Sequence, residues 1–284
     1  MKRHDAQWHD QQYNNRARVP DAMAILERWA TASAAVRAQH RCALDVPYGA
    51  SPRERLDIFP ADQRGAPVLV FIHGGYWRAL TKSDASLVAP AFTSKGATVV
   101  VPDYDLCPQV SVETISLQMA QALAWTWRHI GEHGGDPSRI VVVGHSAGGH
   151  LAAMMASCRW RDLGADLPPR LIQGALAISG LFDLDPIRQT PFLQADLKLT
   201  PASVKRLSPA FFPRPRAVPL YAVAGGAESE EFVRQGKLIR DQWGPTAVPV
   251  CESVPGRNHF DVLHNLVEPD GRTHQLALKL LGLA

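Results

Sequence analysis

The chain has 284 residues, of which 46% are hydrophobic and 20% are charged, and its formal net charge is +3. A chain of this length easily builds a large buried core. The 30 basic and 27 acidic residues nearly cancel and form no basic run, so we expect no nucleic-acid partner. The four cysteines are widely spaced and include no CxxC pair, which argues against a disulfide framework or a zinc site.

The polar N-terminus lacks the apolar stretch of a secretory signal. The longest apolar runs, around residues 68–72 and 99–101, fall far short of the ~20 residues that span a bilayer. We therefore expect a soluble, cytoplasmic protein with no membrane partner.

The N-terminal part of the chain predicts a helix followed by a strand pair. Residues 20–39 have the pattern of a helix outside the sheet, within a helical and polar N-terminal segment that spans 1–40. The runs 42–48 and 55–59 predict strands joined by the turn-rich residues 49–52. This pair is expected to form an antiparallel edge before the parallel part of the sheet begins.

From residue 66 onward, short apolar runs alternate with longer amphipathic stretches. The runs predict strands buried on both faces, at residues 68–72, 97–101, 140–143, 175–178, 220–224 and 248–254. The stretches have helical spacing, at residues 83–94, 112–129, 148–158, 230–243 and 262–281. Strands that alternate with helices of this length predict an α/β fold with a mostly parallel, doubly wound sheet.

One segment interrupts this alternation. Residues 181–216 are rich in proline and too long for a simple crossover, so we expect a helical insertion that forms a cap or lid before the next strand. An ordinary irregular connection is the alternative. We expect the whole chain, 1–284, to be a single domain.

The predicted nucleophile is Ser146. The run 140–143 leads directly into Gly-His-Ser-Ala-Gly at residues 144–148, and a helical stretch follows. This is the G-x-S-x-G nucleophile elbow in the context that it requires, a strand, a sharp turn and a helix. The turn strains the serine backbone, and the small residues on either side relieve the crowding.

A second glycine motif, His-Gly-Gly at residues 73–75, follows the run 68–72. Acyl hydrolysis passes through an oxyanion that needs preorganised N–H donors, and glycine allows close approach of the substrate. We expect the N–H groups of Gly74, Gly75 and Ala147 to form this oxyanion hole. His73 is expected to brace the loop, and a plain Gly-Gly turn is the alternative.

A serine nucleophile needs a general base, and position selects among the eleven histidines. His145 and His150 flank the nucleophile and are expected to point away from it or into the helix. His264 and His274 fall in the last predicted helix and are expected to be solvated. His259 follows the last strand-like run, where the final member of a triad in the order Ser, acid, His belongs, so we predict it as the base.

The acid is expected in the loop after the preceding strand, where the sequence offers three glutamates. Glu228 lies on the turn, whereas Glu230 and Glu231 fall in the first helical turn, where acids commonly serve the helix dipole. We therefore predict Glu228 as the partner of the base. Asp183, one strand earlier, is the main alternative.

Taken together, these motifs make the chain resemble the α/β-hydrolase superfamily, and within it the arylformamidase (kynurenine formamidase) group. His-Gly-Gly-Tyr-Trp at 73–77 looks like the oxyanion signature of that group, and Gly-His-Ser-Ala-Gly-Gly at 144–149 matches its elbow. Asn-His-Phe at 258–260 matches its terminal histidine segment, and Glu-Ser-Glu-Glu-Phe at 228–232 aligns with its acid segment. The stretch 48–60 is also similar, so the resemblance covers nearly the whole chain.

The resemblance implies a cofactor-free serine hydrolase acting on an aryl formamide such as N-formylkynurenine. Animal members carry an aspartate where this chain has Glu228, and bacterial sequences of this pattern include general carboxylesterases. A short-chain carboxylesterase is therefore the first alternative. A non-catalytic binding protein on the same scaffold is the second, because a fold alone does not guarantee chemistry.

An aryl substrate implies aromatic contacts, for which Tyr76, Trp77 and Phe182 are the candidates, with core packing as the alternative for each. Other aromatic residues of the insertion are Phe192, Phe211 and Phe212. No metal-ligand pattern such as HExxH is present in the sequence, so we expect no metal and no cofactor. The expected partner is a small-molecule substrate, and a homodimer is left open.

Overall fold

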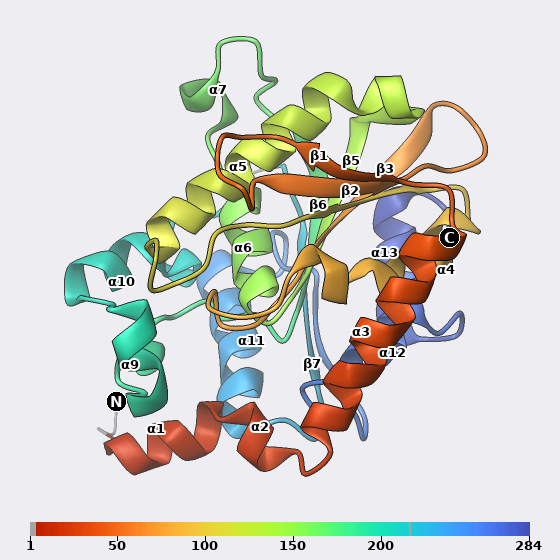
Figure 1. Cartoon of the computed structure of the whole chain (residues 1–284). Coiled ribbons are helices and arrows are strands. Elements are labelled where there is room, and N and C mark those ends of the chain that lie inside the picture. Colours follow the sequence, from red (N-terminus) through yellow and green to blue (C-terminus); the bar gives the residue numbers. More distant parts are fainter. Residues whose placement is uncertain (1–3, 216) are drawn as a thin grey trace.

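Eight strands form one sheet in the part of the chain that the computed structural model describes, residues 4–215 and 217–284. Their order across the sheet is β1-β2-β4-β3-β5-β6-β7-β8 (Figure 1). Their bounds are β1 Ala43–Pro47, β2 Arg55–Phe59, β3 Ala66–Ile72, β4 Thr98–Pro102, β5 Gly135–His145, β6 Ile172–Ile178, β7 Leu220–Gly225 and β8 Val250–Val254. Strands β3 to β8 run parallel, whereas β1 and β2 pair antiparallel at one edge. The predicted fold class is confirmed.

Helices cover both faces of this sheet. One face carries α5 (Val112–His129), α6 (Ala147–Ala156) and α11 (Glu230–Trp243), and the other carries α3 (Ala22–Gln39), α4 (Ala89–Thr93), α12 (His264–Val267) and α13 (Arg272–Leu281). Along β3, Val68 and Val70 join the first core, whereas Leu69 and Phe71 join the second. Successive side chains point to opposite faces, so the central strands must be apolar throughout.

Two groups of short helices gather near the carboxyl ends of the parallel strands. The N-terminal group is α1 (Ala6–Tyr13) and α2 (Asn15–Arg18), and the insertion group is α8 (Asp185–Arg188), α9 (Pro191–Leu197), α10 (Pro201–Leu207) and the 3₁₀ turn η4 (Pro209–Phe211). Helix α1 contacts α8, α9 and α11 (Figure 1). The insertion is therefore helical as expected. Its movement as a lid stays a prediction.

Two stretches that are predicted as single helices are each divided into several shorter elements. Residues 83–94 form the 3₁₀ turns η1 (Lys82–Asp84) and η2 (Ser86–Val88) followed by α4, and residues 262–281 form the 3₁₀ turn η5 (Asp261–Leu263), α12 and α13. The break between α12 and α13 contains Pro269 and Gly271, and a Cβ on Gly271 would collide with the carbonyl of Asn265. His274 is also buried rather than solvated, since its Nδ1 lies 3.0 Å from the Leu266 carbonyl.

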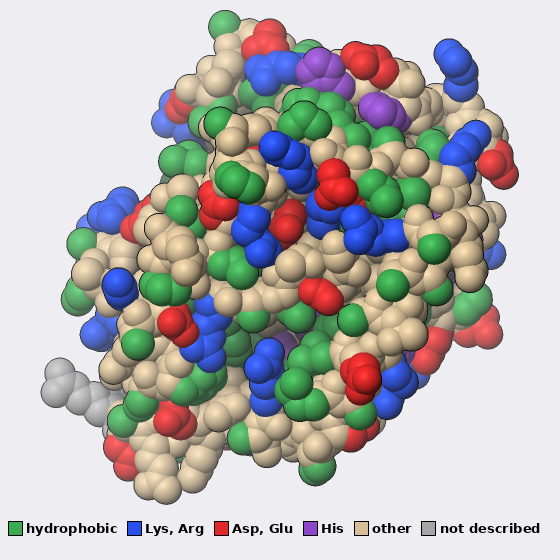
Figure 2. Space-filling model, viewed as in Figure 1, with side chains coloured by type: hydrophobic (Ala, Val, Ile, Leu, Met, Phe, Trp, Pro, Cys, Tyr) green, Lys and Arg blue, Asp and Glu red, His purple; other side chains and the backbone are tan. Residues whose placement is uncertain are grey.

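The remaining short elements are α7 (Trp160–Leu163) and the 3₁₀ turn η3 (Ile130–His133). Figure 2 shows Lys and Arg side chains interspersed with Asp and Glu over the face in view, in keeping with the nearly balanced charge of the sequence. Within the described residues, no helix combines the length and apolar character that crossing a membrane requires.

Candidate active site

Ser146 lies on a sharp turn between β5 and α6. Its backbone has φ 58° and ψ −118°, a strained conformation for a residue other than glycine. The turn depends on the two glycines of the motif, because a Cβ on Gly144 would collide with the Gly148 carbonyl and one on Gly148 would collide with the Ile72 carbonyl. The elbow therefore packs against the end of β3, where the second glycine motif begins.

His259 and Glu228 are both brought to Ser146. The Nε2 atom of His259 lies 3.0 Å from Ser146 Oγ, and its Nδ1 atom lies 2.6 Å from Glu228 Oε2. The side chains of all three residues are almost fully buried. Since a carboxylate only accepts hydrogen bonds, Nδ1 carries the proton and Nε2 is left as an acceptor facing the serine hydroxyl.

The Glu228 carboxylate is held by two further donors. Its Oε1 accepts hydrogen bonds from the Ser179 hydroxyl and the Gly225 N–H, each at 2.5 Å. Asp183, the alternative acid, lies elsewhere: its carboxylate accepts from the Asp185 N–H at 3.1 Å and faces Arg234 at 3.6 Å. Burial raises the pKa of Asp183. The geometry therefore pairs His259 with Glu228.

The sequence predicts that His145 points away from Ser146 or into the helix, but in the structure it lies at the site. Its Nε2–H donates to the backbone carbonyl of His259 at 2.8 Å, and its ring lies 4.9 Å from the His259 ring. Burial, with a smaller contribution from His259, lowers the pKa of His145 to about 3. His145 is therefore a neutral donor that supports the backbone of His259. His150 is directed into the fold, with Nε2 at 2.8 Å from the Leu207 carbonyl.

The predicted oxyanion residues converge beside the nucleophile. A Cβ on Gly74 would lie 3.0 Å from Ser146 Cβ, which places the two residues in direct contact. Gly75 has φ +100° and lines the cavity next to Ser146, and Ala147 begins α6, where N–H groups have no partner within the helix. Among the described residues, neither Gly74 nor Gly75 uses its N–H in a hydrogen bond. These N–H groups are available to a negative oxygen.

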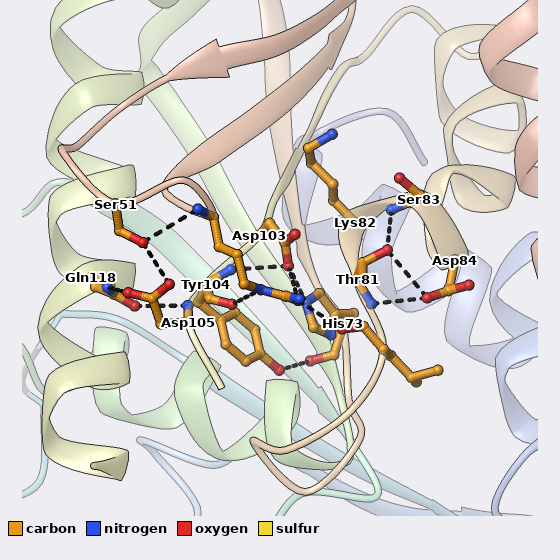
Figure 3. Close-up of polar contacts among 12 residues, drawn as sticks. Ser51, His73, Thr81, Lys82, Ser83, Asp84, Asp103, Tyr104, Asp105 and Gln118 are labelled. Atoms are coloured by element: carbon orange, nitrogen blue, oxygen red, sulfur yellow. Dashed lines mark hydrogen bonds and ion pairs between the residues drawn. The ribbon is translucent and has the colours of Figure 1, made fainter. Parts of the chain in front are cut away.

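Polar contacts around His73 hold the loop that carries Gly74 and Gly75, the predicted oxyanion loop, as Figure 3 shows. His73 Nε2 lies 3.1 Å from Asp103 Oδ1, and the Tyr104 hydroxyl donates to the His73 carbonyl at 2.9 Å. The rings of His73 and Tyr104 stack with centroids 4.2 Å apart. Arg53 donates both to Asp103 and to the Leu80 carbonyl, each at 2.9 Å. The bracing role expected of His73 fits this arrangement.

A cavity of about 450 Å³ opens over Ser146 and His259. Its aromatic walls come from Trp29, Tyr76, Phe192 and Phe260. Of the three aromatic residues predicted as substrate contacts, Tyr76 lines this cavity. Burial, with a smaller contribution from Glu228, raises the pKa of Tyr76 far above its usual range, so its hydroxyl stays neutral.

Two of the predicted substrate contacts are not brought to this cavity. Trp77 and Phe182 are almost fully buried in the core and do not line it. Instead, Trp77 packs edge-on against His150, with ring centroids 5.0 Å apart. Phe211 is largely exposed, and Phe211 and Phe212 do not line the cavity either.

Sequence reasoning missed the N-terminal wall of the site. Asn14, Asn15 and Arg16 line the cavity, although nothing in their local pattern marks them as site residues. Within residues 4–215 and 217–284, no group of histidine, cysteine and acidic side chains is arranged to hold a metal ion. The groups that the structure does bring together at the cavity are the Ser146 hydroxyl, the His259 imidazole and the Glu228 carboxylate.

A family model described as the alpha/beta hydrolase fold matches residues 69–234. The chain belongs to the α/β-hydrolase family. It is 30% identical to a kynurenine formamidase of Danio rerio and 31% identical to one of Salmo salar, in each case over 84% of this chain and 82% of the relative. Membership of the kynurenine-formamidase-like group, as the resemblance implied, is confirmed.

Solved structures of other hydrolases also resemble this α/β-hydrolase. A protein of Silicibacter sp. TM1040 described as a thioesterase has a TM-score of 0.82 and 30% identity, covering 93% of this chain and 96% of its own. The carboxylesterase EstE1 from a metagenomic library has a TM-score of 0.70 at 22% identity, covering 91% and 93%, which supports the fold alone. The chain is therefore a hydrolase of formamidase or esterase type.

Proposed function

We propose that this protein hydrolyses aryl formamides of the N-formylkynurenine type through a Ser146–His259–Glu228 triad and an acyl-enzyme. The observation that carries the proposal is the continuous hydrogen-bonded path from Ser146 Oγ through both ring nitrogens of His259 to Glu228. A serine hydroxyl is a weak nucleophile alone, and this arrangement supplies the base and the group that orients it.

The first half-reaction follows from the positions of these atoms. Ser146 Oγ attacks the formyl carbonyl while its proton passes to His259 Nε2. The carbonyl oxygen becomes an oxyanion, which the N–H groups of Gly74, Gly75 and Ala147 bind. Glu228 stabilises the imidazolium that forms and holds its orientation.

Departure of the aryl amine is the demanding step, because an amide nitrogen leaves poorly as an anion. His259 returns its proton to that nitrogen as the C–N bond breaks, which releases the neutral amine and leaves the formyl group on Ser146. Water then attacks the acyl-enzyme, again giving its proton to His259. Collapse of this second intermediate frees formate and restores the serine hydroxyl.

The substrate class is supported by similarity and by the cavity. The relatives that match over most of the chain are kynurenine formamidases, and the aromatic walls at Trp29, Tyr76, Phe192 and Phe260 suit an aryl ring. A short-chain carboxylesterase that uses the same triad is the second candidate, because the structural relative at 30% identity is described as a thioesterase and a serine triad also cleaves esters.

The test compares kcat/KM on N-formylkynurenine with kcat/KM on p-nitrophenyl acetate and butyrate, with the Ser146→Ala variant as the blank. A strong preference for the formamide supports the proposal. Efficient ester cleavage with negligible formamide turnover makes the protein a carboxylesterase. Failure of the intact folded protein to react with a serine-directed fluorophosphonate would leave the binding-protein alternative.

A further inference from the structure

The N-terminal segment is fixed over the site by a buried anchor. Tyr13, the last residue of α1, is fully buried and donates its hydroxyl to Glu231 Oε2 at 2.6 Å. Gln235 donates to the same hydroxyl at 3.2 Å, and the Tyr13 carbonyl accepts from the Tyr76 hydroxyl at 2.7 Å. Tyr13 therefore joins α11 to the oxyanion loop. The residues directly after it are held at the cavity wall.

The charges around the cavity are unevenly matched. Besides its histidines, three charged residues line it: Arg16, Arg78 and Asp196. Arg78 already has partners within the protein, because it forms an ion pair with Asp196 and donates to the Phe192 carbonyl at 3.0 Å. Arg16 has neither an ion pair nor a side-chain hydrogen bond to any residue within 4–215 and 217–284. Among the charged side chains that the structure describes around the cavity, this exposed guanidinium is the one left without a counter-charge.

A second donor group lies in the same cavity wall. Asn15 also lines the cavity and is only 5% exposed; its side-chain amide lies near the Tyr76 hydroxyl, but its nitrogen has no partner at hydrogen-bond distance among the residues that the structure describes. Burying an amide donor without a partner costs free energy, so such a group in a cavity wall gains from donating to an acceptor that enters the cavity. A guanidinium and an amide donor on one cavity wall suit a carboxylate, which accepts hydrogen bonds at both oxygens.

We propose that Arg16, with Asn15 beside it, forms a carboxylate-recognition site at the wall of the catalytic cavity, so that the preferred substrates carry an anionic group remote from the scissile carbonyl. The inference rests on the hydrolase function proposed above, since it specifies which substrates the Ser146 site selects. The aromatic residues of the cavity wall suit the aryl ring that joins the carbonyl to the carboxylate.

The test uses two substrate pairs that differ in a carboxylate. The formamide pair is N-formylkynurenine and formanilide, and the ester pair is para-acetoxybenzoate and phenyl acetate. In Arg16→Gln, the KM of the charged member of each pair is expected to rise about tenfold relative to the KM of the neutral member. We expect little change in kcat, because the contact is made equally in the ground and transition states. Arg16→Glu raises the KM of the charged member further by repulsion.

Arg18→Gln is the matched control. Arg18 lies on the same helix α2 but does not line the cavity, and its side chain donates to the Gln11 carbonyl at 3.2 Å. The control is expected to keep the selectivity of the wild-type protein. Equal losses on charged and neutral substrates in Arg16→Gln, or the same loss of selectivity in Arg18→Gln, would overturn the proposal.

Direct binding separates this proposal from the catalytic one. Calorimetry on Ser146→Ala and on Ser146→Ala with Arg16→Gln measures the Kd of N-formylkynurenine against formanilide without turnover. A tenfold loss confined to N-formylkynurenine supports the Arg16 site even where the wild-type protein cleaves only esters, and that outcome refutes the formamidase function alone. Equal affinity of the two compounds for Ser146→Ala refutes the Arg16 site whatever the protein hydrolyses.

Discussion

Replacing Glu228 with glutamine tests the proposed triad most directly, because the change keeps the shape of the side chain and removes its charge. The carboxylate accepts at Oε2 from His259 and at Oε1 from Ser179 and Gly225, all within 2.6 Å. Glutamine has one acceptor oxygen and one NH₂ group, so it cannot satisfy both sides. Either the NH₂ group faces His259, or it faces the buried Gly225 N–H.

Both orientations impair the base. An NH₂ group facing His259 requires Nδ1 to accept, which moves the proton to Nε2 and leaves no acceptor for the Ser146 proton. The wrong tautomer lowers kcat by about 10⁴ in serine proteases. The other orientation leaves a buried donor unpaired, at a cost of about 1–3 kcal/mol, equivalent to roughly 10–10² in rate if the strain falls on the transition state. We expect a loss of kcat between about 10² and 10⁴, with a smaller change in KM.

Two substitutions control this experiment. Glu230→Gln removes a carboxylate from the start of the same helix, but Glu230 is exposed and does not contact His259, so activity should be retained. Asp183→Asn removes the alternative acid, which faces Arg234 rather than the base. Steady-state kinetics with thermal melts separates catalysis from folding. A large loss in Asp183→Asn together with near-normal turnover in Glu228→Gln would refute the pairing of His259 with Glu228.

Three further predictions concern the same region. Ser146→Ala and His259→Ala should each lower kcat by about 10⁴–10⁶ and the double variant by little more, because the two residues act as a unit, and additive losses in steady-state assays would show that they are wrongly paired. Burial lowers the pKa of His150 from 6.5 to about 4, so protonation of the unfolded chain alone costs stability as the pH falls from 6.5 to 4. The loss is about 3 kcal/mol at pH 4, and denaturant titrations should show a weaker pH dependence in His150→Gln. In Gly75→Ala, the new methyl group collides with the Ala79 carbonyl, and the backbone there has a positive φ. We expect kcat to fall by about 10² or more while circular dichroism shows a folded protein. An unchanged kcat would show that Gly75 is not part of the oxyanion hole.

The sequence predicted those features that local patterns encode. The central strands are apolar at every position because helices cover both faces of the sheet, so runs such as 68–72 and 140–143 are visible without any knowledge of the partner strands. The elbow at Ser146 is also encoded locally. Only glycine fits at positions 144 and 148, because a Cβ there would collide with a backbone carbonyl. Chain order then limited the base to the loop after the last strand, and the acid to the two loops that hold Glu228 and Asp183.

Side-chain direction in irregular segments could not be predicted. Tyr76 and Trp77 are adjacent, and both have positive φ, at 50° and 56°, yet Tyr76 lines the cavity and Trp77 packs against His150 in the core. Neither helical nor strand periodicity applies to such residues, so the sequence cannot distinguish the two directions. The break in 262–281 was missed for a related reason, because apolar spacing continues across Gly271 while the backbone does not continue as a helix.

The N-terminal wall of the cavity depends on contacts that no local pattern encodes. Tyr13 and Glu231 are 218 residues apart in sequence, and their hydrogen bond helps to hold Asn15 and Arg16 in the wall of the cavity that contains Ser146. The family match covers 69–234 and so contains the elbow, the glycine loop and Glu228, but none of these wall residues. Proteins that share the catalytic motifs can therefore differ at this wall. If Arg16 recognises a carboxylate, the substrate selectivity of this chain depends on its N-terminal segment, whereas its chemistry depends on the triad.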